Sequence, residues 1–300
     1  MSAQFEVIII GGSYAELSAA LTLGRSMRKV LVLDGGKPCN RQVSHSHNFL
    51  THDGVEPAQI AAIARGQILL YPTVEFKAGT AVKAVPQNNG FTIEAENGET
   101  FAAKKLLFAT GVFDIMPAIP GFAECWGVSI AQCPYCHGYE VRNTNLGILA
   151  NGDMAFESCK MINHWSKNLT LFTNGKSTLN QEQESIIRLY NIPVVENEIE
   201  LIEHKQGNIQ NIIFKDGNHY FLEGLFTKVL FEQNTHLPEA LGCTMTKEGF
   251  VAVNDFQQTN NKGVYAAGDN TTMFRSISVA VAAGTKAGAF INKELIDDSF

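Results

Sequence analysis

The 300-residue chain lacks the features of several large functional classes. No apolar run approaches the ~20 residues that a membrane-spanning helix needs. Positive charge is also scarce, since 23 Lys and Arg stand against 30 Asp and Glu, a net charge of −7. We therefore expect no membrane insertion and no nucleic-acid surface. No basic leader precedes the first apolar strand, so we expect a cytoplasmic protein.

Clusters of metal ligands are missing too. Only Cys133 and Cys136 of the six cysteines lie close together in the sequence. The others are isolated: Cys39, Cys125, Cys159 and Cys243. A structural zinc site needs a second cysteine pair or a close histidine pair with matching spacing. His45 and His47 have no third ligand at such a spacing, so we expect no metal site.

The stretch Cys-Pro-Tyr-Cys-His-Gly-Tyr-Glu, residues 133–140, predicts redox chemistry. Two cysteines separated by two residues can close and reopen a disulfide with little backbone movement. A thiolate in such a pair is stabilised by its neighbour, which lowers its pKa. His137 follows directly and can carry a proton near neutral pH. A static disulfide is the less favoured interpretation, because nothing indicates an oxidising compartment.

A nucleotide-binding pattern stands at the start of the chain. The apolar run Val7–Ile10 stops at a glycine turn, and a helix rich in small residues follows over 17–24. The next strand, 29–33, ends on Asp34, about twenty residues after the glycines, where an acid can bind a ribose. We assign the turn to the nucleotide: Gly11, Gly12, Ser13, Tyr14 and Ala15.

The glycine fingerprint of this turn is altered at two places. Ser13 takes the position of the second glycine and Glu16 that of the third. The third glycine normally permits close packing of helix on strand, and Glu16 also brings negative charge near a diphosphate. We expect the site to persist with looser packing and weaker binding.

Other strands lead to small-residue turns that can approach a cofactor. A buried strand over 105–108 enters Ala109-Thr110-Gly111, and another over 263–267 ends in Gly268 and Asp269 before a helix over 277–295. We expect further strands at 80–85, 91–95 and 250–253, and a helix over 56–71. Candidate cofactor contacts also lie in loops and strand starts: Gly35, Arg41, Asn48, Ala81, Val82, Ser276 and Ile277.

A second strand–turn–helix unit follows the cysteine pair. The strand 146–149 leads into a turn, and the strand 168–172 ends in Thr173-Asn174-Gly175-Lys176. We take as nicotinamide-site candidates Gly152, Asp153, Met154, Ala155 and Lys176. Two such units indicate two bound nucleotides, or one whose partner site has decayed. Segments 113–122 and 231–241 break regular patterns and are predicted linkers.

In order and spacing, these motifs resemble the low-molecular-weight thioredoxin reductase family of FAD-dependent pyridine nucleotide-disulfide oxidoreductases. The form Cys-Pro-Tyr-Cys-His is similar to the branch with gliotoxin- and holomycin-type dithiol oxidases. The resemblance implies an α/β fold of two Rossmann-like, three-layer domains, the second inserted in the first. It implies an FAD domain over 1–116 and 242–300, a pyridine-nucleotide domain over 117–241, and a homodimer.

The resemblance also implies roles for the redox residues. Cys136 would exchange electrons with the flavin, Cys133 would form the mixed disulfide with substrate, and His137 would move the proton. The substrate would be a thioredoxin-like protein or a small-molecule dithiol or disulfide.

The electron donor and the direction remain open at this stage. The family's arginines for the 2′-phosphate of NADPH are replaced by residues 173–175, and Lys176 alone is a weak substitute. The electron donor is therefore NADPH or NADH, or the protein uses no nicotinamide at all. The resemblance implies a reductase that passes two electrons between NAD(P)H, FAD, the Cys133–Cys136 pair and a disulfide substrate. The alternatives are a dithiol oxidase using FAD and oxygen, and a non-catalytic flavin-binding protein.

Overall fold

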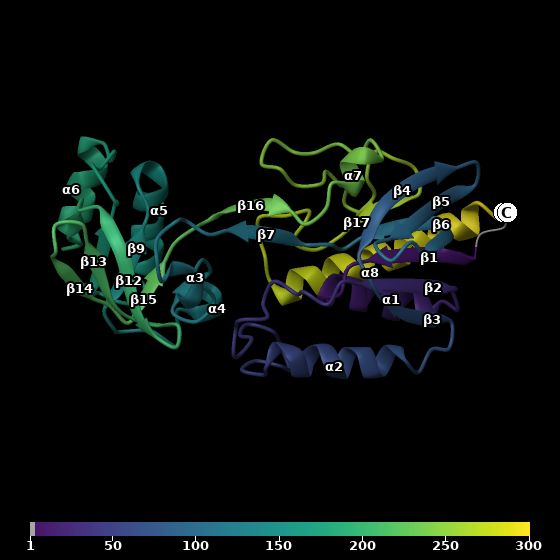
Figure 1. Ribbon diagram of the computed structural model, residues 1–300, viewed down its shortest axis with the longest axis horizontal. Coiled ribbons are helices and arrows are strands. Elements are labelled where there is room, and N and C mark those ends of the chain that lie inside the picture. Colours follow the sequence, from purple (N-terminus) through teal and green to yellow (C-terminus); the bar gives the residue numbers. More distant parts are fainter. Residues whose placement is uncertain (1–3) are drawn as a thin grey trace. The chain divides into compact units, whose positions relative to one another are not determined.

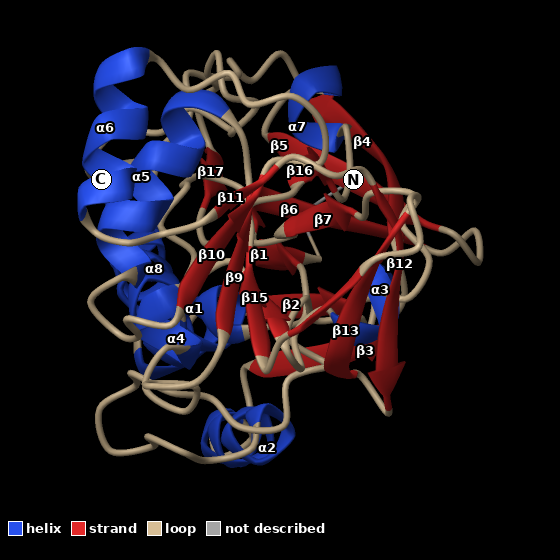
Figure 2. Ribbon diagram, turned by 90° about the vertical axis from the view of Figure 1, so that its left-hand side faces the viewer, coloured by secondary structure: helices blue, strands red, loops and turns tan. Residues whose placement is uncertain are grey.

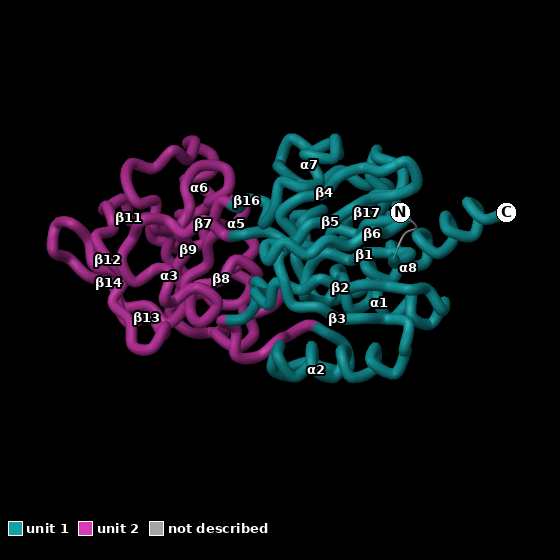
Figure 3. The backbone as a smooth tube through the Cα atoms, turned by 45° about the vertical axis from the view of Figure 1, so that its right-hand side comes forward, with its two compact units in different colours: residues 1–41, 49–113, 231–300 teal, residues 42–48, 114–230 magenta. Residues whose placement is uncertain are grey.

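The structure is a computed structural model that describes residues 4–300, and these fall into two compact units. Figure 1 shows the helices and strands along the chain. Unit 1 contains the residues up to Arg41 together with Phe49–Phe113 and Phe231–Phe300, and unit 2 contains Gln42–Asn48 and Asp114–Leu230. Figure 2 distinguishes helices from strands, and Figure 3 traces the two units in different colours.

Unit 1 is built on a seven-stranded sheet in the order β3-β2-β1-β6-β5-β4, with β17 paired to β6. The strands are β1 (Phe5–Ile10), β2 (Val30–Asp34), β3 (Val74–Ala78), β4 (Ala81–Gln87), β5 (Gly90–Ala95), β6 (Thr100–Phe108) and β17 (Val264–Ala266). The strands β1, β2, β3, β6 and β17 pair in parallel, while β4 and β5 join in antiparallel. Ile10 pairs with both Leu33 and Phe108, and Phe108 with Ala266. The carboxyl ends of four strands therefore meet at one edge of the sheet.

Helices α1 (Tyr14–Arg25), α2 (Pro57–Ile68), α7 (Leu237–Ala240) and α8 (Ile277–Asp297) complete unit 1. Helices α1 and α8 lie side by side (Figure 1). A Cβ on Gly284 of α8 would fall 1.9 Å from the carbonyl oxygen of Ala15, so only glycine allows this approach. The hydroxyl of Ser18 donates to the carbonyl of Val281 at 2.8 Å. The core between these helices and the sheet is made of aliphatic side chains and alanines.

A buried cation ties the end of α8 to the sheet. Lys105 on β6 has a side chain only 5% exposed, and its Nζ pairs with Glu294 at 2.8 Å and Asp298 at 2.5 Å. The hydroxyl of Tyr265 donates to the other oxygen of Glu294 at 2.7 Å. The hydrogen bond from Lys105 is the main cause that lowers the pKa of Asp298.

Lys105→Ala is expected to lower the free energy of unfolding by about 2 kcal/mol or more, because it leaves Glu294 with no cation in a largely buried position. Urea denaturation followed by circular dichroism measures the change. The control is Lys104→Ala, one residue away and exposed, which should change stability by less than about 0.5 kcal/mol. Equal losses in the two variants would contradict the assignment.

Unit 2 has a parallel five-stranded sheet in the order β11-β10-β9-β15-β8 and a separate antiparallel sheet of β12-β13-β14. The parallel strands are β8 (Ile130–Ala131), β9 (Leu146–Leu149), β10 (Leu169–Phe172), β11 (Val194–Val195) and β15 (Gly224–Phe226). The antiparallel strands are β12 (Ile199–Lys205), β13 (Asn208–Phe214) and β14 (His219–Phe221). The helices are α3 (Phe122–Cys125), α4 (Pro134–His137), α5 (Gly152–Ile162) and α6 (Gln181–Leu189). The two α/β units with parallel sheets confirm the predicted fold class.

Three sequence-based expectations are wrong. The predicted strand 250–253 does not form: Val251 makes one bridge to Met245, and its N–H donates instead to Asn270 at 2.9 Å. The segment 113–122 is not irregular, because β7 (Val112–Ile115) pairs with β16 (Leu230–Gln233) and α3 begins at Phe122. The return segment 231–241 likewise contains β16 and α7. The domain boundaries at 116/117 and 241/242 stay predictions.

Candidate functional site

The first glycine turn of unit 1 is shaped for a close ligand. It joins β1 to α1, and a Cβ on Gly12 would fall 1.7 Å from Oδ1 of Asp34, so the backbone and the acid are in near contact. Ser13 is the N-cap residue of α1 but makes no capping hydrogen bond with its side chain. The first turn of α1 is therefore not capped by its own serine, and helix N-termini attract anions.

Asp34 at the end of β2 is fixed by two partners. Its Oδ1 accepts from the N–H of Gly36 at 2.7 Å, and its Oδ2 pairs with Nη2 of Arg65 at 2.6 Å. Arg65 also lies over the ring of Phe76. Sequence reasoning missed Arg65, because nothing in the helical pattern of 57–68 distinguishes an arginine directed at the site from a solvated one.

The turns after β6 and β17 lie at the same sheet edge. The N–H of Ala109 donates to Ile10 at 2.8 Å, and the N–H of Ala267 donates to Phe108 at 3.0 Å. Asp269 contacts Sγ of Cys39 at 3.6 Å and Nε of Arg275 at 3.4 Å. Thr110 and Gly111 lie in the turn after β6, and Gly268 precedes Asp269 in the turn after β17.

The remaining predicted contacts are placed differently. Ser276 caps α8 by accepting from the N–H of Val279 at 3.2 Å, and Ile277 is the first residue of that helix. Gly35, Ala81 and Val82 lie near the end of β2, because Ala78 pairs with Asp34 just before β4 begins. The Tyr14 hydroxyl donates to Pro57, Ala15 lies under Gly268, and Arg41 donates to Pro38. Asn48 belongs to unit 2, and its cofactor contact stays a prediction.

Buried polar atoms at this edge have no hydrogen-bond partner among residues 4–300. They are Oε1 and Oε2 of Glu16, Oγ1 of Thr110 and Oδ1 of Asn270. Native structures leave few such atoms without a partner. A ligand with hydroxyl and phosphate groups would supply partners, so the residues present fit an adenine dinucleotide such as FAD.

The surroundings of Glu16 disfavour its charged form. Burial raises its pKa well above the ordinary value, and the charge of Asp34 adds to that effect. The Ser13 amide and Arg65 favour the charged form but do not outweigh burial.

The cysteine pair forms a closed disulfide between Cys133 and Cys136, with Cα atoms 5.3 Å apart. Cys133 is the N-cap residue of α4, and the backbone N–H groups of Cys136 and His137 donate back to its carbonyl at 3.2 Å. Pro134 occupies the first helical position, where its missing N–H costs no hydrogen bond. The redox pair is thus held on one short turn of helix.

His137 is a half-buried base beside this disulfide, and both of its ring nitrogens are buried. Neither ring nitrogen has a hydrogen-bond partner among the described residues. Burial lowers its pKa, the Cys133 backbone and Glu140 oppose that shift, and His47 adds to it. His47 pairs with Glu140 at 3.6 Å, a contact that sequence reasoning missed because the two lie 93 positions apart in the chain. A neutral imidazole can take a proton from a thiol.

The second glycine turn differs from the first, because a side chain of the turn, Asn151, makes hydrogen bonds to the backbone groups around it. Oδ1 of Asn151 accepts from the N–H groups of Gly152 at 2.9 Å and Thr178 at 2.8 Å, and its Nδ2 donates to Lys176 at 2.9 Å. Asp153 in the first turn of α5 accepts from Nε2 of Gln183 at 2.7 Å. Met154 is partly exposed, and Ala155 is buried.

Hydrogen bonds also fix the loop after β10 to the segment around residues 196–199. Oδ1 of Asn174 accepts from the N–H of Ile199 at 2.7 Å, and the N–H of Ser177 donates to the carboxylate of Glu196 at 2.7 Å. Lys176 is the one cationic residue of the stretch 173–178. The place where a 2′-phosphate would bind therefore carries one cation and a nearby anion.

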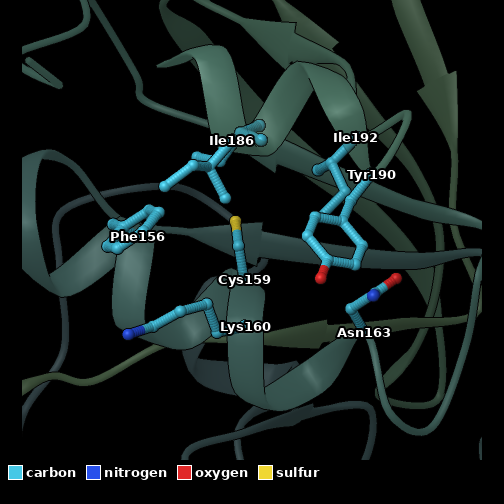
Figure 4. A pocket seen from close by; sticks show the side chains of 8 residues that line it. Phe156, Cys159, Lys160, Asn163, Ile186, Tyr190 and Ile192 are labelled. Atoms are coloured by element: carbon cyan, nitrogen blue, oxygen red, sulfur yellow. The ribbon is translucent and has the colours of Figure 1, made fainter. Parts of the chain in front are cut away.

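A hollow of about 470 Å³ lies between α5 and α6 (Figure 4). It is lined by Phe156, Cys159, Lys160, Asn163, Ile186, Ile187, Tyr190 and Ile192. None of the nicotinamide candidates lines it. Burial raises the pKa of Cys159 to about 12, which leaves this thiol unreactive near neutral pH.

Comparison with known proteins identifies the family. The model of the pyridine nucleotide-disulphide oxidoreductase family matches residues 5–284, and the chain belongs to that family. A thioredoxin reductase, tcpT, from Claviceps purpurea is 33% identical over 304 residues, covering 98% of this chain and 95% of the relative. An oxidoreductase structure from Agrobacterium tumefaciens is 36% identical with a TM-score of 0.91, covering 97% of this chain and 98% of the other. A putative thioredoxin reductase structure, TrxB, from Bacillus anthracis is 30% identical with a TM-score of 0.94, covering 99% and 100%.

These findings confirm the resemblance, the fold class and the enzyme class drawn from the sequence. The chain is an FAD-dependent disulfide oxidoreductase of the thioredoxin reductase type, a class that uses FAD and NAD(P)H. The assignments of single residues stay predictions. Among residues 4–300, no helix is both long and apolar enough to span a membrane.

Thiol reactivity should separate the cysteines. Without reductant, iodoacetamide is expected to modify Cys39, which is exposed, and not Cys125, Cys159 or Cys243, whose thiol pKa values burial raises. After mild reduction of the native protein, Cys133 and Cys136 should also be modified. Mass spectrometry of peptides measures both patterns, and labelling of Cys133 before reduction would contradict the closed pair.

Proposed function

We propose that the chain exchanges two electrons between FAD and a dithiol or disulfide substrate through the Cys133–Cys136 pair. The closed disulfide on α4 beside the neutral, partnerless ring of His137 carries this proposal. FAD, when bound, supplies the two-electron step. The relatives named thioredoxin reductase support the direction of disulfide reduction.

Different residues of unit 1 would contact different parts of the cofactor. The turn Gly11–Ala15 would bind the diphosphate and Asp34 the adenosine ribose. Asp269 would accept a hydrogen bond from a ribityl hydroxyl, and Ser276 and Ile277 would lie beside the ring. These assignments rest on the sheet edge and on its unpaired polar atoms.

In unit 2, the chemistry is thiol–disulfide exchange with one proton carrier. The reduced pair holds two electrons and two protons more than the disulfide. The Cys133 thiolate attacks a substrate disulfide to form a mixed disulfide, and the Cys136 thiolate then attacks Cys133 and releases the substrate dithiol. His137 takes a proton from an attacking thiol and returns it to the leaving thiolate. A thioredoxin-like protein or a small disulfide is the proposed substrate, for a cytoplasmic homodimer.

Anaerobic measurement of flavin absorbance tests the direction of electron transfer, from NAD(P)H to a disulfide or from a dithiol to oxygen. We expect NADH or NADPH to bleach the flavin band of the holoprotein, with NADH faster because Asn174 and Gly175 offer no charge to a 2′-phosphate. Bleaching by a dithiol alone, with recovery in air, would replace the reductase by the oxidase. A protein that takes up no FAD would overturn both.

Cys133→Ser and Cys136→Ser should each abolish turnover and leave FAD bound, because a serine hydroxyl cannot form the disulfide. Turnover is measured as reduction of a disulfide by NAD(P)H, and FAD content by absorbance. Cys243→Ala is the matched control in the core of unit 1 and should retain turnover. Wild-type turnover in either serine variant would contradict the mechanism.

One observation favours a second candidate function, a dithiol oxidase in which substrate dithiol reduces the pair and oxygen reoxidises the flavin. Asn151 satisfies the N–H of Gly152 at the start of α5, and Asp153 places a carboxylate in the same turn. A diphosphate bound there would have to displace the side-chain amide of Asn151 and would lie near the negative charge of Asp153.

Asp153→Asn is therefore expected to lower the NADH concentration needed for half-maximal flavin reduction by about two- to fivefold, the effect of one charge at a helix terminus. The rate with a dithiol should stay unchanged. Stopped-flow absorbance measures both, with Glu200→Gln on the exposed face of β12 as the control. No change with NADH would show that this turn does not bind the nucleotide.

A further inference from the structure

Glu16 is a buried acid within the first nucleotide turn. Its side chain is 0% exposed, and neither carboxyl oxygen has a hydrogen-bond partner among residues 4–300. Its Oε2 lies 2.9 Å from the point that a Cβ on Gly11 would occupy, so the carboxyl is directed against the first glycine of the turn. The backbone N–H of Ser13, the N-cap residue, acts on this carboxyl without meeting the geometry of a hydrogen bond.

Few charged groups act on this carboxyl. Asp34 on β2 opposes its ionisation, Arg65 on α2 favours it, and the amide dipole of Ser13 favours it as well. Arg65 is already paired with Asp34 at 2.6 Å. Helix α8 packs on this part of α1 through Gly284, which brings no charge.

We propose that Glu16 is a determinant of FAD binding that accepts the cofactor only as the neutral acid, so that binding is coupled to one proton. The inference rests on the FAD site proposed for unit 1. The diphosphate binds at the start of α1, where Asp34 already contributes one negative charge. An ionised Glu16 would add a second in the same buried region, where like charges repel strongly.

The sign of the pH dependence follows from this coupling. The complex holds the proton at Glu16 more tightly than the apoprotein does, because the diphosphate disfavours the carboxylate. FAD affinity is therefore greatest at low pH, where Glu16 is protonated in both the apoprotein and the FAD complex. Affinity falls as the pH rises and Glu16 loses its proton in the apoprotein. One coupled proton limits the loss to about tenfold per pH unit.

The test is titration of the apoprotein with FAD, followed by quenching of flavin fluorescence, from about pH 6 to about pH 9. We expect the wild-type Kd to rise with pH at a slope approaching about tenfold per unit. Glu16→Gln, which keeps the shape and cannot ionise, should give a flat profile. Glu16→Gly restores the third fingerprint glycine and should be flat with tighter binding. Glu182→Gln in the first turn of α6 is the control and should keep the wild-type slope.

Proton uptake provides a readout that needs no variant. Calorimetry of FAD binding in two buffers of different ionisation enthalpy should show uptake of up to about one proton by the wild type at alkaline pH. A flat wild-type profile without proton uptake overturns the inference while FAD binding stands. A slope that persists in Glu16→Gln assigns the proton to another group and also overturns it. Failure to bind FAD at every pH overturns the proposed function as well.

Discussion

The close packing of α8 on α1 is the contact on which unit 1 depends. These helices come from opposite ends of the chain, and Gly284 and Gly288 let α8 approach the backbone of α1 at Ala15 and Ala19. This approach holds β17 and the turn at Asp269 beside the turn that begins with Gly11. A single added methyl at Gly284 would overlap a carbonyl oxygen of the helix that opens the nucleotide site. The site is therefore assembled by backbone contact, before any ligand contributes.

The two glycine turns show how similar local sequences can serve different chemistry. In unit 1 the N-cap Ser13 makes no capping bond, and the acid of the turn has no partner, so polar atoms are left for a ligand. In unit 2 the amide of Asn151 satisfies the helix start and joins it to the loop at Thr178. A buried polar atom without a partner costs free energy, whereas a satisfied turn does not. The turn of unit 1 therefore holds polar atoms that a ligand could satisfy, whereas the turn of unit 2 satisfies its own.

Much of this arrangement could be predicted from the sequence, because strand, glycine turn and helix follow each other locally. The strand at 146–149 and the helix near 277–295 agree with the structure, the latter capped at its start by Ser276. The predicted strand at 250–253 is wrong, because its apolar run reflects burial of Phe250 and Val251 and not a strand ladder. Arg65 and His47 could not be found, since their partners lie 31 and 93 residues away. Such pairings are set by tertiary packing and leave no periodic signal.

Two polar side chains with buried, unpartnered atoms connect these observations. His137 lacks a partner beside the disulfide, and Glu16 lacks one beside the first glycine turn. Under the proposed function, each would lie where negative charge develops, as a thiolate in one case and a diphosphate in the other. A neutral base can remove a proton as the thiolate forms, and a neutral acid adds no charge against an anion. Burial shifts the pKa of each group toward its neutral form, so the desolvation that makes these groups costly to the fold is also what favours the neutral state that the proposed roles need.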